Sequence, residues 1–383
     1  MKHRIRRCVG VGALALALAG QAAATPFVPA SDGEVLASLP AGARHADPAI
    51  RADARARIDI ALPLAQFYIR EARASGDLRF LGYADAVLAP WVDGAQPVAA
   101  ALVLQATLQQ SRHEFARSLA TLDRALALVP DDPQAWLTRA TVLRVQGRYG
   151  DADEACTQFA RRSEERMALI CHQGVAGLIG HLAAAYAALA AVNTGGMTDA
   201  ERAWREAELG DMAVRLGRET EAGQWYRSAL LHDPQDLYVR AALADLLLGQ
   251  HRDRDVLALL AGRDSIEPLL LRVAIAQKAL HDPAFAHSRE LLRAAFAAEA
   301  ARGEPVHQRE QARFLIEVED DPAAALQAAL ANWNLQREPA DVLVLVEAAT
   351  AAGSAAAAQP ALAFVRQRGL QDIRLAPAAA VGS

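Results

Sequence analysis

The stretch AWREAELGDMAVRLGRETEAGQWYRSALLHDP, residues 203–234, contains two amphipathic segments on either side of a short break. Apolar residues recur at helical spacing in both segments, which predicts two helices that pack against each other. Gly217, at the break, suits the left-handed conformation that commonly ends a helix. Pro234 stops the second helix, because proline lacks a backbone N–H and clashes with the preceding turn. The stretch therefore predicts a helical hairpin.

Two earlier stretches, 101–130 and 135–160, repeat this arrangement. In the second of them, Gly147 takes the place of Gly217, and the large residue Tyr149 follows it. Small residues such as Ala140 and Gly210 are expected where two helices approach closely. Weaker versions of the unit extend in both directions, with breaks at 76–77, 281–283, 320–322 and near 353. Aromatic residues are only 5% of a chain rich in alanine, leucine, arginine and glutamate, a composition typical of helical proteins.

This pattern resembles the tetratricopeptide repeat, a helix-turn-helix unit of about 34 residues. The resemblance covers most of the chain and is specific for residues 98–260. It implies an all-α fold, a right-handed α-solenoid of roughly seven or eight stacked hairpins. The expected organisation is a leader (1–24), an irregular lead-in (25–47), a degenerate helical unit (48–97), clear repeats (98–260), divergent hairpins with a C-terminal cap (261–374) and a tail (375–383).

The first 24 residues have the layout of a secretory signal peptide. Four basic residues open the chain, the apolar run 9–19 is too short to span a membrane, and Ala22 and Ala24 supply the small-x-small cleavage pattern. We expect cleavage after Ala24 and a periplasmic or secreted protein without stable membrane insertion.

The net charge argues against nucleic acid as a partner. Removing a leader with four basic residues leaves 36 basic and 45 acidic residues, a net charge of −9. Nucleic-acid binders carry clustered excess basic charge, so neither nucleic acid nor an anionic lipid surface is expected.

The sequence contains none of the catalytic or cofactor motifs that we sought, neither GxSxG, a phosphate loop, HExxH nor CxxC. His232 and His281 each precede Asp-Pro, a setting typical of helix ends. The two Asp-Asp-Pro runs, 131–133 and 320–322, predict helix caps followed by proline in the first turn more strongly than paired catalytic carboxylates. We therefore expect no catalytic residues, no cofactor and no metal.

The family resemblance implies a groove, lined by the first helix of each hairpin, that holds a protein or peptide. The positions that match are Gln134, Arg144, Trp204, Asp211, Arg215, Tyr238 and Asp245. Trp204 could equally pack on the preceding hairpin. Relatives that clamp acidic tails use Lys and Asn where this chain has Leu137 and Thr141, so that ligand is not expected. The resulting hypothesis is an exported, non-catalytic scaffold for protein or peptide binding that serves the assembly of an envelope complex. The alternative is a regulatory subunit or an enzyme with a dispersed site.

Cys156 and Cys171 are the two cysteines outside the leader, 15 positions apart. The repeat pattern places them in neighbouring antiparallel helices, at similar distances from the intervening turn at 163–164. A disulfide would join the two helices, and the predicted export would allow it to form. Two separate buried thiols remain the alternative.

Overall fold

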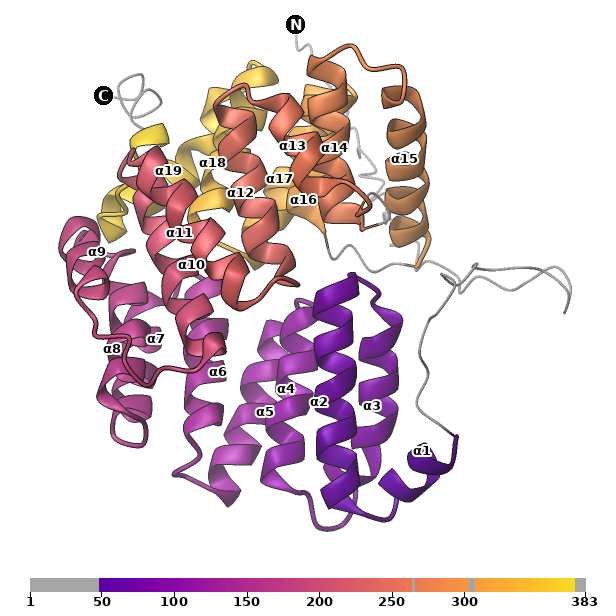
Figure 1. Cartoon of the computed structure of the whole chain (residues 1–383), viewed down its shortest axis with the longest axis vertical. Coiled ribbons are helices and arrows are strands. Elements are labelled where there is room, and N and C mark those ends of the chain that lie inside the picture. Colours follow the sequence, from indigo (N-terminus) through magenta and orange to yellow (C-terminus); the bar gives the residue numbers. More distant parts are fainter. Residues whose placement is uncertain (1–47, 264–265, 303–306, 376–383) are drawn as a thin grey trace, which may run out of the picture.

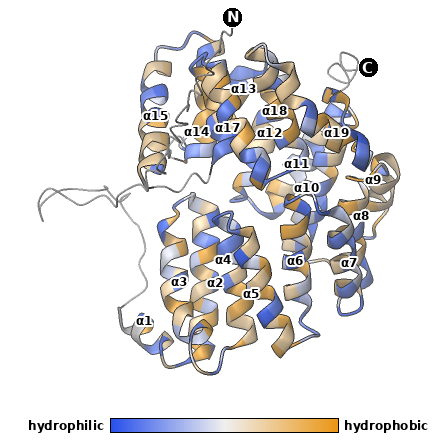
Figure 2. Ribbon diagram, turned by 180° about the vertical axis from the view of Figure 1, so that it is seen from behind, coloured by the Kyte–Doolittle hydropathy of each residue, from blue (hydrophilic) through white to orange (hydrophobic). Residues whose placement is uncertain are grey.

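The computed structural model describes residues 48–263, 266–302 and 307–375. The predicted leader and lead-in, and all but the first residue of the predicted tail, lie outside these ranges. Within them the chain is an all-α solenoid, as the repeats predicted (Figure 1). Hydrophobic residues are distributed over the hairpins from α2 to α19 (Figure 2). No helix in the described ranges is long and apolar enough to cross a membrane.

Successive helices pair as antiparallel hairpins. Helix α1 (Pro48–Ala54) precedes nine such pairs in the described ranges, somewhat more than the seven or eight expected. The pairs are α2 (Ile58–Ser75) with α3 (Arg79–Val92), α4 (Ala99–Ser111) with α5 (Phe115–Leu128), α6 (Pro133–Val145) with α7 (Tyr149–Ala160), α8 (Glu165–Ala176) with α9 (Leu182–Ala190), α10 (Asp199–Arg215) with α11 (Glu219–His232), α12 (Leu237–Gly249) with α13 (Asp253–Leu260), α14 (Glu267–Ala279) with α15 (Phe285–Arg302), α16 (Gln308–Arg313) and its π-helical continuation Phe314–Val318 with α17 (Pro322–Leu335), and α18 (Pro339–Ala351) with α19 (Gln359–Arg368).

Local sequence signals set the ends of these helices. Gly147 and Gly217 adopt φ angles of 70° and 73°, the predicted left-handed turns. Asp132 and Asp321 accept hydrogen bonds from backbone N–H groups in the first turns of α6 and α17, so the Asp-Asp-Pro runs are caps. Thr198 forms a capping box at the start of α10.

Small and large residues interlock inside the hairpins, as the repeat pattern predicted. A Cβ atom on Gly210 would lie 2.3 Å from the ring of Tyr226, so only glycine allows α10 and α11 to approach this closely. Tyr226 is 2% exposed and fills the space that the glycine leaves. The same helix pair makes the most extensive contact between elements of the described chain.

The solenoid winds back on itself, so that late hairpins contact the turns of earlier ones. The backbone N–H of Arg337 donates to the carbonyl of Val145 at 2.8 Å, and the hydroxyl of Tyr149 donates to the carbonyl of Arg337 at 3.0 Å. The backbone N–H of Leu182 donates to the side chain of Gln371 at 3.1 Å. One apolar core accordingly unites residues of 140–178 with residues of 312–375. The middle and the end of the chain therefore share a core.

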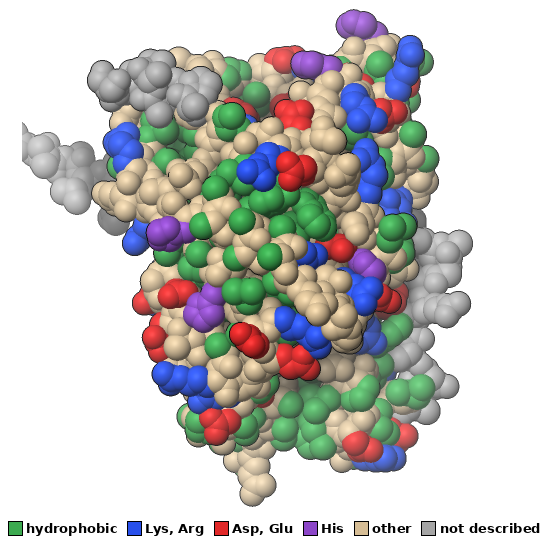
Figure 3. All heavy atoms as spheres, turned by 60° about the vertical axis from the view of Figure 1, so that its left-hand side comes forward, with side chains coloured by type: hydrophobic (Ala, Val, Ile, Leu, Met, Phe, Trp, Pro, Cys, Tyr) green, Lys and Arg blue, Asp and Glu red, His purple; other side chains and the backbone are tan. Residues whose placement is uncertain are grey.

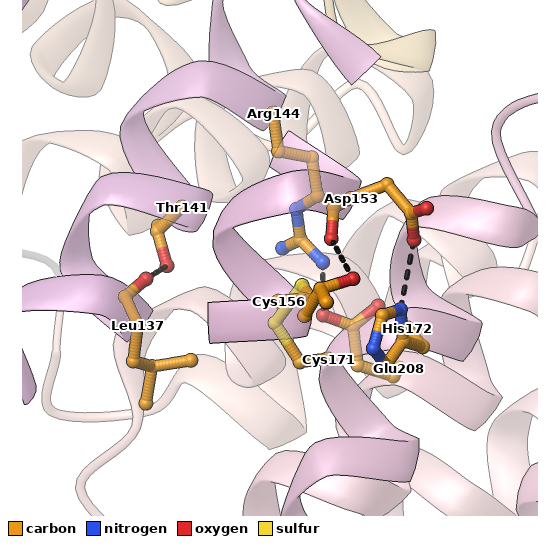
Figure 4. The surroundings of a disulfide bond; sticks show 9 residues. Leu137, Thr141, Arg144, Asp153, Cys156, Cys171, His172 and Glu208 are labelled. Atoms are coloured by element: carbon orange, nitrogen blue, oxygen red, sulfur yellow. Dashed lines mark hydrogen bonds and ion pairs between the residues drawn. A yellow bond between two sulfur atoms is a disulfide. The ribbon is translucent and has the colours of Figure 1, made fainter. Parts of the chain in front are cut away.

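A disulfide joins Cys156 in α7 to Cys171 in α8 (Figure 4). Their Cα atoms lie 5.6 Å apart, and both side chains are buried. Of the two alternatives that the sequence left open, the structure has the bridge between neighbouring hairpins. Beside it, the imidazole of His172 lies 2.8 Å from the carboxylate of Asp153, a second link between the same helices.

Candidate binding groove

The first helices of the first three hairpins enclose a groove of about 430 Å³, called here the α2–α4–α6 groove. It takes residues from the same face of each helix. These are Gln66, Ile69, Arg70 and Arg73 of α2, Leu104, Thr107 and Gln110 of α4, and Gln134, Leu137, Thr138 and Thr141 of α6. A volume of this size is within the range of ligand-binding clefts.

The lining of this groove is polar and carries only positive charge. None of the described residues that line it is acidic, and Arg70 and Arg73 are exposed and make no ion pair with any described residue. Burial lowers the pKa of the Arg73 guanidinium, and the charge of the Asp236 carboxylate opposes this shift. That carboxylate is engaged in capping α12, where it accepts from the backbone N–H of Val239 at 3.0 Å. The groove therefore contains two arginines that pair with no carboxylate of the described residues.

The other polar groups of the lining are side-chain amides and hydroxyls. The Thr138 and Thr141 hydroxyls donate to carbonyls one turn earlier in α6, at 2.8 and 3.1 Å. The side chain of Gln134 donates to the Thr138 hydroxyl at 3.3 Å. The side chains of Gln66 and Gln110 have no hydrogen-bond partner among the described residues and remain available to a ligand.

Of the seven positions that the sequence singled out, only Gln134 lines the groove. Arg144, two to three turns further along α6, forms an ion pair with Glu208 of α10 (Figure 4). Trp204 is partly buried and packs against two apolar cores. This packing is compatible with the alternative that the sequence left open for Trp204, and a binding role for this residue stays a prediction.

Asp211, Arg215 and Tyr238 lie outside the groove, and the side chain of Tyr238 is 57% exposed. Asp211 accepts hydrogen bonds from the hydroxyls of Tyr226 and Tyr238, at 2.7 and 2.6 Å. Burial, together with the charge of Glu208, raises the pKa of Asp211 to about 6. Arg215 is buried and donates to the carbonyl of Gly177 at 2.7 Å.

Asp245 is part of an ion-pair network between α12, α14 and α16. It lies 2.7 Å from Arg272 and 2.9 Å from Arg313. Burial alone would raise the pKa of this carboxyl, but the two arginines outweigh it and hold the pKa at about 2. Asp245 and its arginines therefore compensate one another inside the protein.

The groove residues of α2 and α4 escaped the sequence analysis, although their spacing carries a signal. Gln66, Arg70 and Arg73 follow one another at intervals of four and three residues, so they share one helix face. That face corresponds to the one that Gln134, Leu137 and Thr141 form on α6. The unit 48–97 matched the repeat poorly, which left its positions without an assignment.

The surface itself shows no strongly charged patch of one sign on the face drawn in Figure 3. Acidic and basic side chains are interspersed there with hydrophobic ones. The positive charge of the α2–α4–α6 groove is therefore confined to the groove, because the chain as a whole has a net charge of −5.

No protein-family model and no curated protein matches this chain. Several solved structures resemble it. A tetratricopeptide repeat protein from Parabacteroides merdae is 16% identical with a TM-score of 0.39, over 61% of this chain and 93% of that one. The Cut9–Hcn1 hetero-tetramer of the APC/C is 13% identical with a TM-score of 0.40, over 77% and 53%. The human IFIT1 dimer with m7Gppp-AAAA is 10% identical with a TM-score of 0.46, over 84% and 93%.

These likenesses carry no argument about function. The repeat type is evident from the chain's own hairpins: α4 and α6 begin at Ala99 and Pro133, 34 residues apart, and each is followed by a short turn and an antiparallel partner. The chain is a tetratricopeptide-like solenoid.

Proposed function

We propose that this chain is a non-catalytic scaffold that binds an extended, acidic peptide segment of a partner protein in the α2–α4–α6 groove. The observation that carries the proposal is the pair Arg70 and Arg73. Both residues are exposed, and among the described residues neither has an ion-pair partner and none that lines the groove is acidic. Arginine forms a planar fork of N–H donors that matches a carboxylate, so an acidic side chain suits this place best. This departs from the expectation drawn from Leu137 and Thr141, because the positive charge of the groove comes from α2 and not from those positions of α6.

The remaining lining residues fit a peptide rather than a small ion. The side-chain amides of Gln66 and Gln110 can each donate and accept, as the backbone of an extended peptide requires. Ile69, Leu104 and Leu137 provide apolar contact between the polar groups. A groove of about 430 Å³ suits a segment of a few residues.

Nucleic acid is a weaker candidate for the same groove. The solved IFIT1 dimer contains a capped oligonucleotide, but its TM-score of 0.46 is too low to transfer that ligand. The chain has 45 acidic and 40 basic residues, and this negative net charge opposes the binding of a polyanion. Two arginines also provide too little positive charge to bind a polyanion.

The proposed place of action is the periplasm or the exterior, with a partner from an envelope complex. The leader-like residues 1–24 support export, and the Cys156–Cys171 disulfide is compatible with an oxidising compartment. N-terminal sequencing of protein from fractionated cells tests this location. A mature N-terminus at Thr25 in the envelope fraction is expected, and cytoplasmic protein that begins at Met1 would contradict export.

A peptide-display selection tests the binding function. Random peptides are selected on the wild-type chain, on the double variant R70A/R73A and on the control variant R254A. Arg254 is also exposed and without an ion pair among the described residues, but it lies in α13, away from the groove. We expect peptides enriched in Asp and Glu from the wild type and R254A, and loss of that enrichment with R70A/R73A. Equal enrichment on all three proteins would refute the groove as the site.

A further inference from the structure

Three potential metal ligands converge where α14, α15 and α16 meet. Glu267 is the first residue of α14, Glu299 lies in the last turn of α15, and His307 immediately precedes α16. Nδ1 of His307 lies 2.8 Å from Oε1 of Glu299 and 3.4 Å from Oε1 of Glu267. All three ligand atoms lie within 4.8 Å of one another. The hairpin fold thus brings together residues that are 32 and 8 positions apart in the sequence.

The hydrogen bonding of this cluster is incomplete. Both carboxylates face the same ring nitrogen, and one N–H cannot point along two directions at once. The bond goes to Glu299, which is 6% exposed. Oε1 of Glu267 is buried and has no hydrogen-bond partner among the described residues. A buried carboxylate oxygen without a donor is costly, so the site would gain from a cation between the three ligand atoms.

The separations also suit coordination. Zn–N and Zn–O bonds of about 2.0–2.2 Å place the ligand atoms of a tetrahedral site roughly 3.3–3.6 Å apart. The His307–Glu267 separation of 3.4 Å is within this interval, and the His307–Glu299 separation of 2.8 Å is slightly short. Small side-chain rotations would make room for the ion.

We propose that Glu267, Glu299 and His307 bind one divalent transition-metal ion, with zinc as the representative probe and water at the open position. One imidazole nitrogen with two carboxylate oxygens favours such ions over Ca²⁺ and Mg²⁺, which prefer oxygen alone. The ion would join the ends of two consecutive hairpins. Glu310, in the first turn of α16, also interacts electrostatically with His307, but its carboxylate lies 3.6 Å from Arg309 and 3.9 Å from Arg272, which compensate its charge.

This site lies outside the expectations drawn from the sequence, which predicted no metal. Its ligands come from three helix ends and form no short motif. The competing explanation is a protonated His307 that simply forms ion pairs with both glutamates.

A second histidine in the chain supplies a matched control. Nδ1 of His232 lies 3.0 Å from Asp199, and its Nε2 lies 3.8 Å from Glu206. The two carboxylates therefore face opposite ring nitrogens, and one ion cannot bind the imidazole and both carboxylates. His232→Ala removes a similar ion-pair cluster without removing the proposed metal ligands.

The experiment is a zinc titration by isothermal calorimetry on the full, untagged chain after EDTA treatment and dialysis. We expect one equivalent of zinc for the wild type and H232A, with binding weakened on the order of 100-fold or more in H307A and E299Q. Cobalt should give the visible absorption bands of a low-coordinate site in the wild type and not in H307A. Circular dichroism checks the fold of each variant, and E267Q replaces any variant that misfolds. Absence of zinc binding, or binding that H307A, E299Q and E267Q leave unchanged, would overturn the proposal.

Discussion

At the scale of single residues, Asp245 shows how the interior of the solenoid tolerates charge. Its carboxylate contacts Arg272 and Arg313, and Arg272 is 6% exposed at its side chain. Replacing Asp245 by asparagine removes a negative charge that Arg272 and Arg313, two largely buried cations, both contact. Breaking a buried pair costs about 3–5 kcal/mol. Here the side chain of Asp245 is 35% exposed and both arginines keep another glutamate, so we expect a loss of about 2 kcal/mol at pH 7.

The pH dependence of this contribution follows from the lowered pKa of Asp245, about 2 against an ordinary value near 3.9. The native state favours the ionised carboxylate, so the stabilisation is complete above about pH 4 and declines as the pH falls toward 2. Urea unfolding of the wild type and D245N at pH 7 and at pH 2.5 measures it. The difference between them should shrink at the lower pH. D59N, in the exposed pair with Arg57, should behave as the wild type. An unchanged D245N at pH 7 would contradict this account.

At the scale of elements, the turn between α6 and α7 carries both a backbone requirement and a long-range contact. Gly147 has φ of 70°, and a Cβ there would lie 2.8 Å from the ring of Phe364 in α19 and 3.0 Å from Arg337. Gly353 has φ of 63°, but a Cβ there would meet nothing within 4 Å. Gly353→Ala should therefore lower the free energy of unfolding by about 1–2 kcal/mol, the cost of a left-handed alanine. Gly147→Ala should lower it by more, because the added Cβ also meets Phe364 and Arg337. Urea unfolding compares them, and equal losses would contradict the packing of α19 on this turn.

The disulfide between α7 and α8 is a second element-scale feature. It closes a loop of 15 residues, for which the chain-entropy model gives about 3 kcal/mol. We expect reductant to lower the stability of the wild type by roughly that amount. The double variant C156A/C171A should be less stable and insensitive to reductant. Two free thiols in envelope-purified protein, measured by mass spectrometry without reduction, would contradict the bridge.

The sequence predicted these elements well because their signals are local. Gly147, Gly217, Asp132 and Thr198 each act within a few residues of a helix end. Non-glycine residues in left-handed turns, such as His251 with φ of 56°, carry no comparable signal. The sequence could not predict the ion pairs either, because partners such as Arg144 and Glu208 are 64 positions apart. For the same reason the groove was only partly predicted: Gln134 belongs to a clear repeat, whereas Arg70 and Arg73 belong to a degenerate one.

At the scale of the whole molecule, the winding of the solenoid joins distant hairpins. In an open repeat array each unit contacts only its neighbours, and the ends unfold independently. Here the core that contains Leu143 and Tyr149 also contains Leu345 and Phe364. Native-state hydrogen exchange should therefore place α6, α7, α18 and α19 in one protection class. Exchange of α18 and α19 well before α6 and α7 would show that the contact does not stabilise the end of the chain.

The same winding determines which surface is left for a partner. Arg144 forms an ion pair, and Asp211, Arg215 and Asp245 are engaged within the protein, whereas the groove keeps two arginines and two glutamines without partners among the described residues. The account's central claim is therefore that the α2–α4–α6 groove, and not the polar networks around Asp211 and Asp245, binds an acidic peptide.

The most direct measurement is site-specific photocrosslinking of a selected acidic peptide to the purified full chain. A photoreactive residue is placed at Gln134 in the groove or, as the control, at Arg254 in α13. The account predicts a crosslink from position 134 that R70A/R73A abolishes, and none from position 254. Equal crosslinking from both positions, or a crosslink at 134 that survives R70A/R73A, would contradict it.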